Sequence, residues 1–203
     1  SNNNISKKGF ISNFGGMIAN MNYEAKNTGG DYKTGETVSE LKSVLTYKTS
    51  LPLKKDKINS FNIFSPSFMI RYAPGHMRNL SEESTMLKFT NLFSMNKTSE
   101  IETGLSAILG FDFKKSDKKR DGSDKERFSL SVGQVFRAER NEDIPVKSSL
   151  DQKMSDIVGE LNYNFLNIGS IDYRFSIDHN MNDLNYNEIS SNFNLGKVDF
   201  NID

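Results

Sequence analysis

Side chains able to do acid–base or metal chemistry are few and scattered. His76 and His179 are the only histidines, and neither has a second ligand at metal-binding spacing. Cysteine is absent, which excludes disulfides and thiolate metal sites. Serines are plentiful, but none stands in the G-x-S-x-G sequence that exposes a nucleophile on a sharp turn. The sequence therefore makes no case for an enzyme and implies no cofactor.

Carboxylates offer one alternative chemistry. Glu160, Asp172 and Asp178 stand on the polar sides of expected strands, where a catalytic pair would suit a barrel enzyme such as a lipase. That enzyme would also need a serine aligned with a base, and neither histidine is close to an obvious nucleophile in the sequence. We favour hydration of a polar surface as the role of these carboxylates.

The carboxylates lie in stretches where apolar and polar residues alternate. In residues 127–137, Phe128, Leu130, Val132 and Phe136 share one side, and only Gln134 and Val135 depart from the pattern. The same alternation recurs in residues 14–25, 39–51, 67–73, 104–113, 155–165, 169–178 and 187–195. No amphipathic helix of normal length is visible, and the best short candidate is residues 80–89. The pattern predicts an all-β chain of consecutive antiparallel strands.

Strand length separates a membrane barrel from a soluble sheet. The patterned runs span about ten to thirteen residues, whereas soluble strands have about five or six and membrane strands need about nine to eleven. Ionisable residues keep to one face, as they must when the other meets lipid. We therefore predict an antiparallel transmembrane β-barrel segment with about nine or ten strands of a larger barrel. No stretch is long and apolar enough for a membrane helix.

The two faces give two sets of candidate residues. The apolar face is expected to meet lipid, and in residues 14–25 it holds Met17, Ala19, Met21 and Tyr23. The main lipid-facing candidates are Leu105, Leu109, Phe111, Phe128, Leu130, Val132, Phe136, Ile171, Tyr173 and Phe175. The lumen-facing candidates are Glu160, Asn162, Asn164, Asp172, Arg174, Ser176, Asn192 and Asn194. Wetting the interior is the simpler role for the second set, and contact with a specific ligand is the other.

Connection lengths give a second test, because outer-membrane barrels alternate short periplasmic turns with longer outer loops. We expect connections at 26–36, 52–57, 73–99, 114–125 and 138–153, followed by shorter ones. Residues 73–99 are expected to form one long outer loop that carries some apolar residues inward. The run 114–125 is rather long for a turn and breaks the alternation.

Composition agrees with a barrel and disfavours one class of partner. Lys plus Arg equals Asp plus Glu, 26 each, and this balance argues against a nucleic-acid binder. Hydrophobic residues make up only 35%, with a mean hydropathy of −0.58. That is low for a soluble globule but suits strands with a polar residue at every second position. No signal peptide is visible, and we expect residues 1–203 to be a fragment of one barrel domain.

Several segments go beyond a generic barrel pattern. "TNLFSMNKTSEIETG" (residues 90–104), "FSLSVGQVFR" (128–137) and "SSLDQKMSDIVGEL" (148–161) resemble, in this order, the C-terminal β-barrel of the LptD family. The Pro-bracketed "SPSFMIRYAP" (65–74) and the closing "EISSNFNLGKVDFNI" are also similar to that family. The resemblance covers roughly residues 60–203, and residues 1–59 fit only as generic barrel strands.

The resemblance implies a function. The LptD family assembles lipopolysaccharide in the outer membrane of Gram-negative cells. It receives lipopolysaccharide from a periplasmic Lpt bridge and releases it sideways into the outer leaflet. The partners implied are lipopolysaccharide, outer-membrane lipid, the bridge and a plug lipoprotein, LptE. We expect the family's N-terminal jelly-roll domain to lie outside residues 1–203, and the family's inter-domain disulfides have no counterpart in this cysteine-free sequence.

Two further classes stay open at this point. A passive porin or a receptor-type transporter barrel would share strand length and alternation, but should lack the "TNLF" and "SVGQ" segments in this order. A soluble β-sheet binding module would need no detergent once purified.

Overall fold

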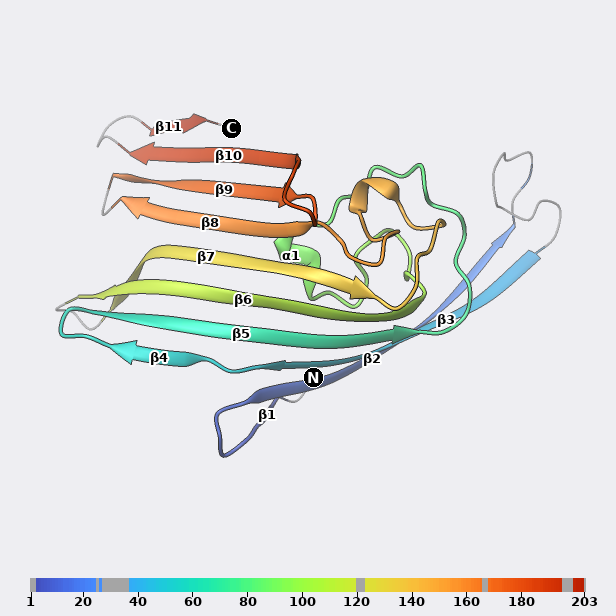
Figure 1. The fold of residues 1–203 in the computed structure, drawn as a ribbon, viewed down its shortest axis with the longest axis horizontal. Coiled ribbons are helices and arrows are strands. Elements are labelled where there is room, and N and C mark those ends of the chain that lie inside the picture. The colour runs from blue at the N-terminus through green and yellow to red at the C-terminus, as the bar shows by residue number, and fades with distance from the viewer. Residues whose placement is uncertain are drawn as a thin grey trace.

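The computed structural model describes residues 3–24, 26, 37–119, 123–165, 168–194 and 199–202. They form one antiparallel sheet (Figure 1), which confirms the predicted all-β fold. The strands are β1 (Asn4–Ile5), β2 (Ile11–Glu24), β3 (Thr37–Ser50), β4 (Leu53–Asp56), β5 (Ser60–Ala73), β6 (Gly104–Lys118), β7 (Asp124–Arg137), β8 (Ile157–Phe165), β9 (Gly169–Ile177), β10 (Leu184–Asn194) and β11 (Asp199–Ile202). Within the described residues, two short helical turns interrupt the connections, α1 (Phe89–Leu92) and the 3-10 turn η1 (Val146–Ser148).

Strands that are neighbours in the sequence are also neighbours in the sheet. The order is β1-β2-β3-β5-β6-β7-β8-β9-β10-β11, and β4 pairs with β5 beyond the end of β3. Pro52 falls in the break between β3 and β4, where its missing N–H costs the ladder nothing. β2, β3, β5 and β7 each have 14 residues and β6 has 15, far beyond the usual soluble strand.

Long and short connections alternate more regularly than expected. The expected connection at 52–57 is wrong, because Leu53–Asp56 is strand β4 and the turn closes with Lys57 N donating to Ser60 O at 2.8 Å. The long turn expected at 114–125 is also wrong, because β6 runs on to Lys118 and β7 begins at Asp124. A strand can continue with charged side chains beyond its apolar residues. Because the prediction took such charged runs as turns, it placed the ends of these strands too early.

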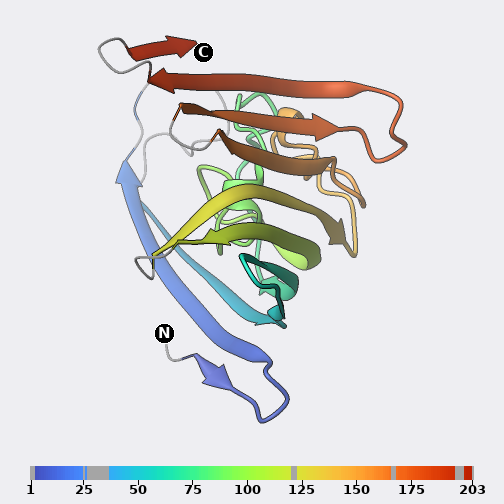
Figure 2. The same cartoon turned by 90° about the vertical axis from the view of Figure 1, so that its left-hand side faces the viewer.

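The long connection 74–103 and the connection 138–156 fold back over one face of the sheet. Lys88 bonds to Tyr186 on β10, while Glu100 pairs with Lys42 on β3, so the loop spans strands at opposite sides of the sheet. The sheet bends around this loop, which lies between the N-terminal and C-terminal strands (Figure 2). We call the loop-covered side the inner face and the opposite side the outer face. The expectation that 73–99 carries apolar residues inward is confirmed.

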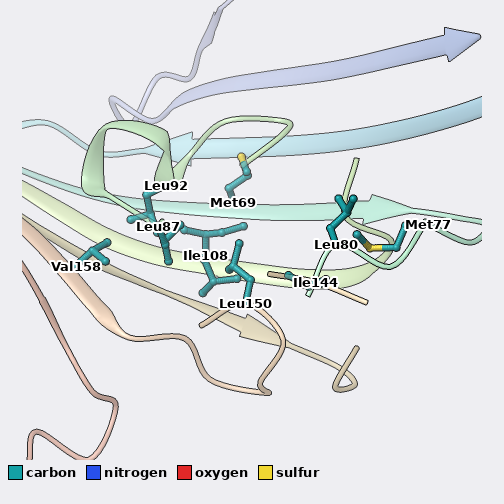
Figure 3. Packing of buried hydrophobic residues seen from close by; sticks show 10 residues of the cluster. Met69, Met77, Leu80, Leu87, Leu92, Ile108, Ile144, Leu150 and Val158 are labelled. Atoms are coloured by element: carbon teal, nitrogen blue, oxygen red, sulfur yellow. The ribbon is translucent and has the colours of Figure 1, made fainter. Parts of the chain in front are cut away.

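A compact apolar core joins the loops to the inner face (Figure 3). Its members are Met69, Ile108, Val135 and Val158 from four strands, and Met77, Leu80, Leu87, Leu92, Ile144 and Leu150 from the two connections. Burying each of these side chains stabilises the fold by about 1.5–3 kcal/mol relative to exposure. The short helix α1, which lies against β7 and β8, begins at Phe89, where the best short helix candidate of the sequence, residues 80–89, ends.

The core explains the two residues that broke the alternation in β7. Val135 is 1% exposed because it belongs to this inner core. Gln134 lies on the outer face, and its Nε2 donates to the carbonyl of Ser155 at 2.7 Å. The side chains of β7 therefore alternate between the two faces along the whole strand. Near the loops the inner face carries an apolar residue, Val135, and the outer face a polar one, Gln134.

The apolar side of β2 faces inward, contrary to the expectation that it meets lipid. Met17 and Ala19 pack against the small inner cluster of Val44, Ala73 and Ile101. Phe14 and Ile18 instead lie on the outer face, 68% and 76% exposed. The connection 74–103 supplies Ile101, and this apolar cover makes an apolar inner side favourable here.

None of the described helical residues forms a helix long and apolar enough to cross a membrane.

Candidate functional site

The structure brings the predicted polar residues of β8, β9 and β10 together on the inner face. Glu160 lies opposite Arg174, Asn162 opposite Asp172, and Asn164 opposite Ser170. The inner-face set placed by the register is Glu160, Asn162, Asn164, Asp172, Arg174, Ser176 and Asn192. The side chain of the remaining candidate, Asn194, lies outside the described residues.

Hydrogen bonds and ion pairs link these side chains across the strands. Arg174 pairs with Glu160 at 3.1 Å and with Glu188 at 3.0 Å. Asn162 donates to Asp172, and Asn164 Nδ2 donates to Asn162 Oδ1 at 2.8 Å. Cross-strand polar pairs of this kind stabilise a sheet, and because they are only partly buried they can exchange partners with water or a passing solute.

A cavity of about 500 Å³ adjoins this polar surface. The predicted Glu160, Asn162 and Asp172 line it together with residues that were not chosen as lumen-facing candidates, among them Lys48 and Asp112. Ser131 Oγ donates to Asp112 Oδ1 at 2.7 Å. Neither of the two histidines lines the cavity. The missed residues occupy the same alternate positions of β3, β6 and β7, so the alternation itself would have found them. Hydroxyl, amide and carboxylate groups in this arrangement suit hydrated, hydroxyl-rich solutes.

Part of the loop 74–103 forms the roof of the cavity. Phe89, Thr90 and Phe93 line it from above, and the two phenyl rings meet edge to face with centroids 6.3 Å apart. Lys48 Nζ lies 4.4 Å from the centre of the Phe93 ring. The cavity therefore has a charged floor on the strands and an aromatic roof on the loop.

Buried ion pairs fasten the loop to the strands. Arg71 on β5 pairs with Glu102 at 2.8 Å, and its Nε and Nη1 donate to the carbonyls of Met95 and Glu102 at 2.6 Å each. Lys42 on β3 pairs with Glu100 at 2.5 Å, and Arg78 of the loop also pairs with Glu100. Sequence reasoning missed this cluster, because nothing in the alternation says which loop carboxylate meets which strand cation.

Lys97 lies inside the same cluster, 4% exposed. Burial lowers the pKa of its ammonium from 10.5 to about 8, although the Glu102 carboxylate raises it. Arg71 and Arg137 lower this pKa further by repulsion. Lys97 Nζ donates to the carbonyl of Ser94 at 3.1 Å. The loop thus holds an ionisable group whose charge changes at mildly alkaline pH.

The ten predicted lipid-facing residues all lie on the outer face. Leu105 and Leu109 are 48% and 50% exposed, and the other eight are half-buried by their neighbours on adjacent strands. Aromatic rings meet along the surface, as with Tyr173 and Phe175, whose centroids are 5.7 Å apart. Gly159 leaves room for the Phe175 ring, since a Cβ there would lie 2.3 Å from that ring. Exposed apolar side chains joined over so many strands indicate contact with lipid or another protein.

Long antiparallel strands, an apolar outer face and a polar inner face define a segment of a membrane β-barrel. The family model described as "LptD: LPS transport system D" matches residues 4–202. The chain belongs to the LptD family, whose members are outer-membrane proteins of lipopolysaccharide transport and assembly. The match includes the first strands, which sequence reasoning had left as generic. No curated protein matches the chain.

Proposed function

We propose that this chain is part of an outer-membrane translocon that inserts lipopolysaccharide into the outer leaflet. Family membership supports transport of lipopolysaccharide. The observation that supports insertion of lipopolysaccharide into the outer leaflet is that the same sheet has an apolar outer face and a polar inner face. An apolar outer face suits the hydrocarbon of the membrane, and a polar inner face with a cavity suits the saccharide part of the cargo.

In the proposed mechanism the cargo passes along the inner face without any covalent bond being made or broken. Glu160, Asn162, Asp172 and Asn192 offer donors and acceptors that sugar hydroxyls can use in place of water. Because Asn162 already bonds to Asp172 and Glu160 to Arg174, a contact of these side chains with the cargo exchanges one hydrogen bond for another. The net affinity stays low, which favours movement over retention.

The loop 74–103 sets the boundary of this path. It is held on β3, β5 and β10 by Lys42–Glu100, Arg71–Glu102 and Lys88–Tyr186. In the proposed role it closes the outer end to small solutes, because it fills the inner face with packed side chains. The energy for transport comes from the periplasmic Lpt bridge, and a plug lipoprotein is the second proposed partner.

Site-specific photo-crosslinking tests the role in the whole protein within its native outer membrane. A photoreactive residue at Asn192, exposed on the inner face, should capture lipopolysaccharide only while new lipopolysaccharide is being delivered. The matched position is Ile189 on the outer face of the same strand, 58% exposed. It should capture membrane lipid whether or not delivery continues.

Two outcomes would count against the translocon. Capture at residue 192 that does not depend on delivery, or no capture there at all, contradicts passage along the inner face. Unchanged surface lipopolysaccharide after depletion of the protein contradicts the function itself. A passive channel would instead conduct small solutes and leave lipopolysaccharide levels unaffected.

A further inference from the structure

A second cavity, of about 400 Å³, lies at the end of the sheet from which the long connections emerge. It is lined by the last residues of β5, the first of β6, and the start of the connection 138–156. Tyr72 and Leu105, which pair across β5 and β6, bring outer-face side chains to it, 49% and 48% exposed. The cavity therefore joins the apolar outer face to polar loop residues, at the level expected for lipid headgroups.

Two guanidinium groups line this cavity. Arg137 is 8% exposed, and its Nη2 donates to the carbonyl of Thr103 at 2.5 Å. Its Nε is buried and has no hydrogen-bond partner among the described residues. Arg140 is exposed and makes no hydrogen bond or ion pair with any residue that the structure describes. A guanidinium carries five N–H donors, so most of this donor capacity is unused.

The charges around the cavity leave it positive. Among the residues that the structure describes, Glu139 is the one carboxylate that lines the cavity, against the two arginines. Glu102 and Asp151 also attract Arg137, but Glu102 already pairs with Arg71 at 2.8 Å. Gly104 keeps the approach to Arg137 open, since a Cβ there would lie 3.1 Å from Nη2.

We propose that this cavity binds the phosphate group of a membrane lipid. Arg140 and Arg137 hold the phosphate oxygens by charge-assisted hydrogen bonds, and Asn141 lines the same cavity as a further donor. The acyl chains of the lipid lie on Tyr72 and Leu105 of the outer face. This lipid source, as opposed to free phosphate, rests on the outer face meeting hydrocarbon, which is part of the proposed function.

Native mass spectrometry of the whole protein in detergent tests the site. The probes are dioleoyl phosphatidylglycerol and diolein, which have the same chains with and without the phosphate. The variants are Arg140→Gln and, as a matched control, Lys147→Gln, an exposed cation of the same connection that does not line the cavity. We expect the unmodified protein and Lys147→Gln to retain phosphatidylglycerol about tenfold more strongly than Arg140→Gln. Diolein should not be retained by any of them.

Equal retention of phosphatidylglycerol by Arg140→Gln and Lys147→Gln would overturn the site, as would equal retention of diolein. A calorimetric titration with inorganic phosphate separates the two sources. Binding of inorganic phosphate as tight as that of the lipid would overturn the lipid assignment and leave a free-phosphate site. These results are independent of capture at residue 192, so failure of this site and failure of the translocon can be distinguished.

Discussion

The Arg71 guanidinium and the Glu102 carboxylate form an ion pair of 2.8 Å in which each side chain is only 1% exposed. Arg71 comes from β5 and Glu102 from the end of the loop 74–103, so the pair fixes the loop against the strand that precedes it. A buried pair stabilises little compared with apolar residues of equal size, but the loss of one partner is costly.

This asymmetry predicts the behaviour of three variants. Arg71→Met should lower the free energy of unfolding by about 3–5 kcal/mol, because Glu102 is left buried without its partner. The double variant Arg71→Met/Glu102→Leu should lose less than the single one. Lys54→Met, which breaks an exposed pair with Asp56, should lose less than about 1 kcal/mol. Urea unfolding in lipid vesicles measures all three, and a double variant worse than the single one would contradict the argument.

The Lys97 ammonium predicts a dependence of stability on pH. Its pKa is about 8 in the folded protein and 10.5 for the free side chain, so between these values only the unfolded chain holds the proton. Unfolding then takes up a proton, and the free energy of unfolding rises with pH by up to about 1.4 kcal/mol per unit in this window. Below pH 8 the Lys97 side chain is protonated in both the folded and the unfolded state, so it does not change the dependence of the unfolding free energy on pH.

Urea midpoints between pH 7 and pH 11 provide the measurement. Because other groups titrate in the same range, the comparison is with Lys97→Met, which should lose the additional slope and gain stability at pH 7. Identical slopes for the two proteins would show that Lys97 keeps an ordinary pKa in the folded state.

Charge substitutions on β6 test which face meets lipid. Leu109 and Leu105 lie on the same outer face four positions apart, with Leu105 next to the long connection. Leu109→Arg should destabilise the protein by about 2–4 kcal/mol, as an arginine near the middle of the bilayer does, and Leu105→Arg by about 0–1 kcal/mol. The unfolding free energy in vesicles distinguishes them. Equal tolerance of both substitutions is the result that an aqueous outer face would give.

Gly159 predicts a size limit on the outer face of β8. A Cβ at this position would lie 2.3 Å from the Phe175 ring, so Gly159→Ala forces the ring to move and should cost about 1–3 kcal/mol. The smaller Leu in the double variant Gly159→Ala/Phe175→Leu should recover part of that loss. The same urea assay decides the point: a double variant with the sum of two independent losses would mean that the two residues do not interact.

Alternation in the sequence predicted the strands and most of their faces, because a strand places successive side chains on opposite sides whatever lies beyond. It did not predict which of two apolar sets on β2 faces inward. Met17 and Ala19 form one such set and Phe14 and Ile18 the other, and the choice depends on Ile101 from the loop. Contacts between segments so far apart in the chain leave no mark on local periodicity.

The candidate site was predictable to a similar extent. Glu160, Asp172 and Arg174 followed from position along the strands, and register alone brought them together. The roof of the cavity, with Phe89 and Phe93, did not follow, since the path of the loop depends on its buried ion pairs and apolar core. The alternation of connection lengths was obscured because charged strand ends resemble turns in composition.

The strand order has a consequence for handling this stretch in isolation. β1 covers only the start of β2, at Ile11 and Ser12, and β11 has its one partner on the β10 side. Residues 13–22 of β2 and the far edge of β11 therefore present amide and carbonyl groups that no neighbouring strand pairs among the described residues. Such edges pair readily with other copies, so residues 1–203 made alone should aggregate through edge-to-edge association.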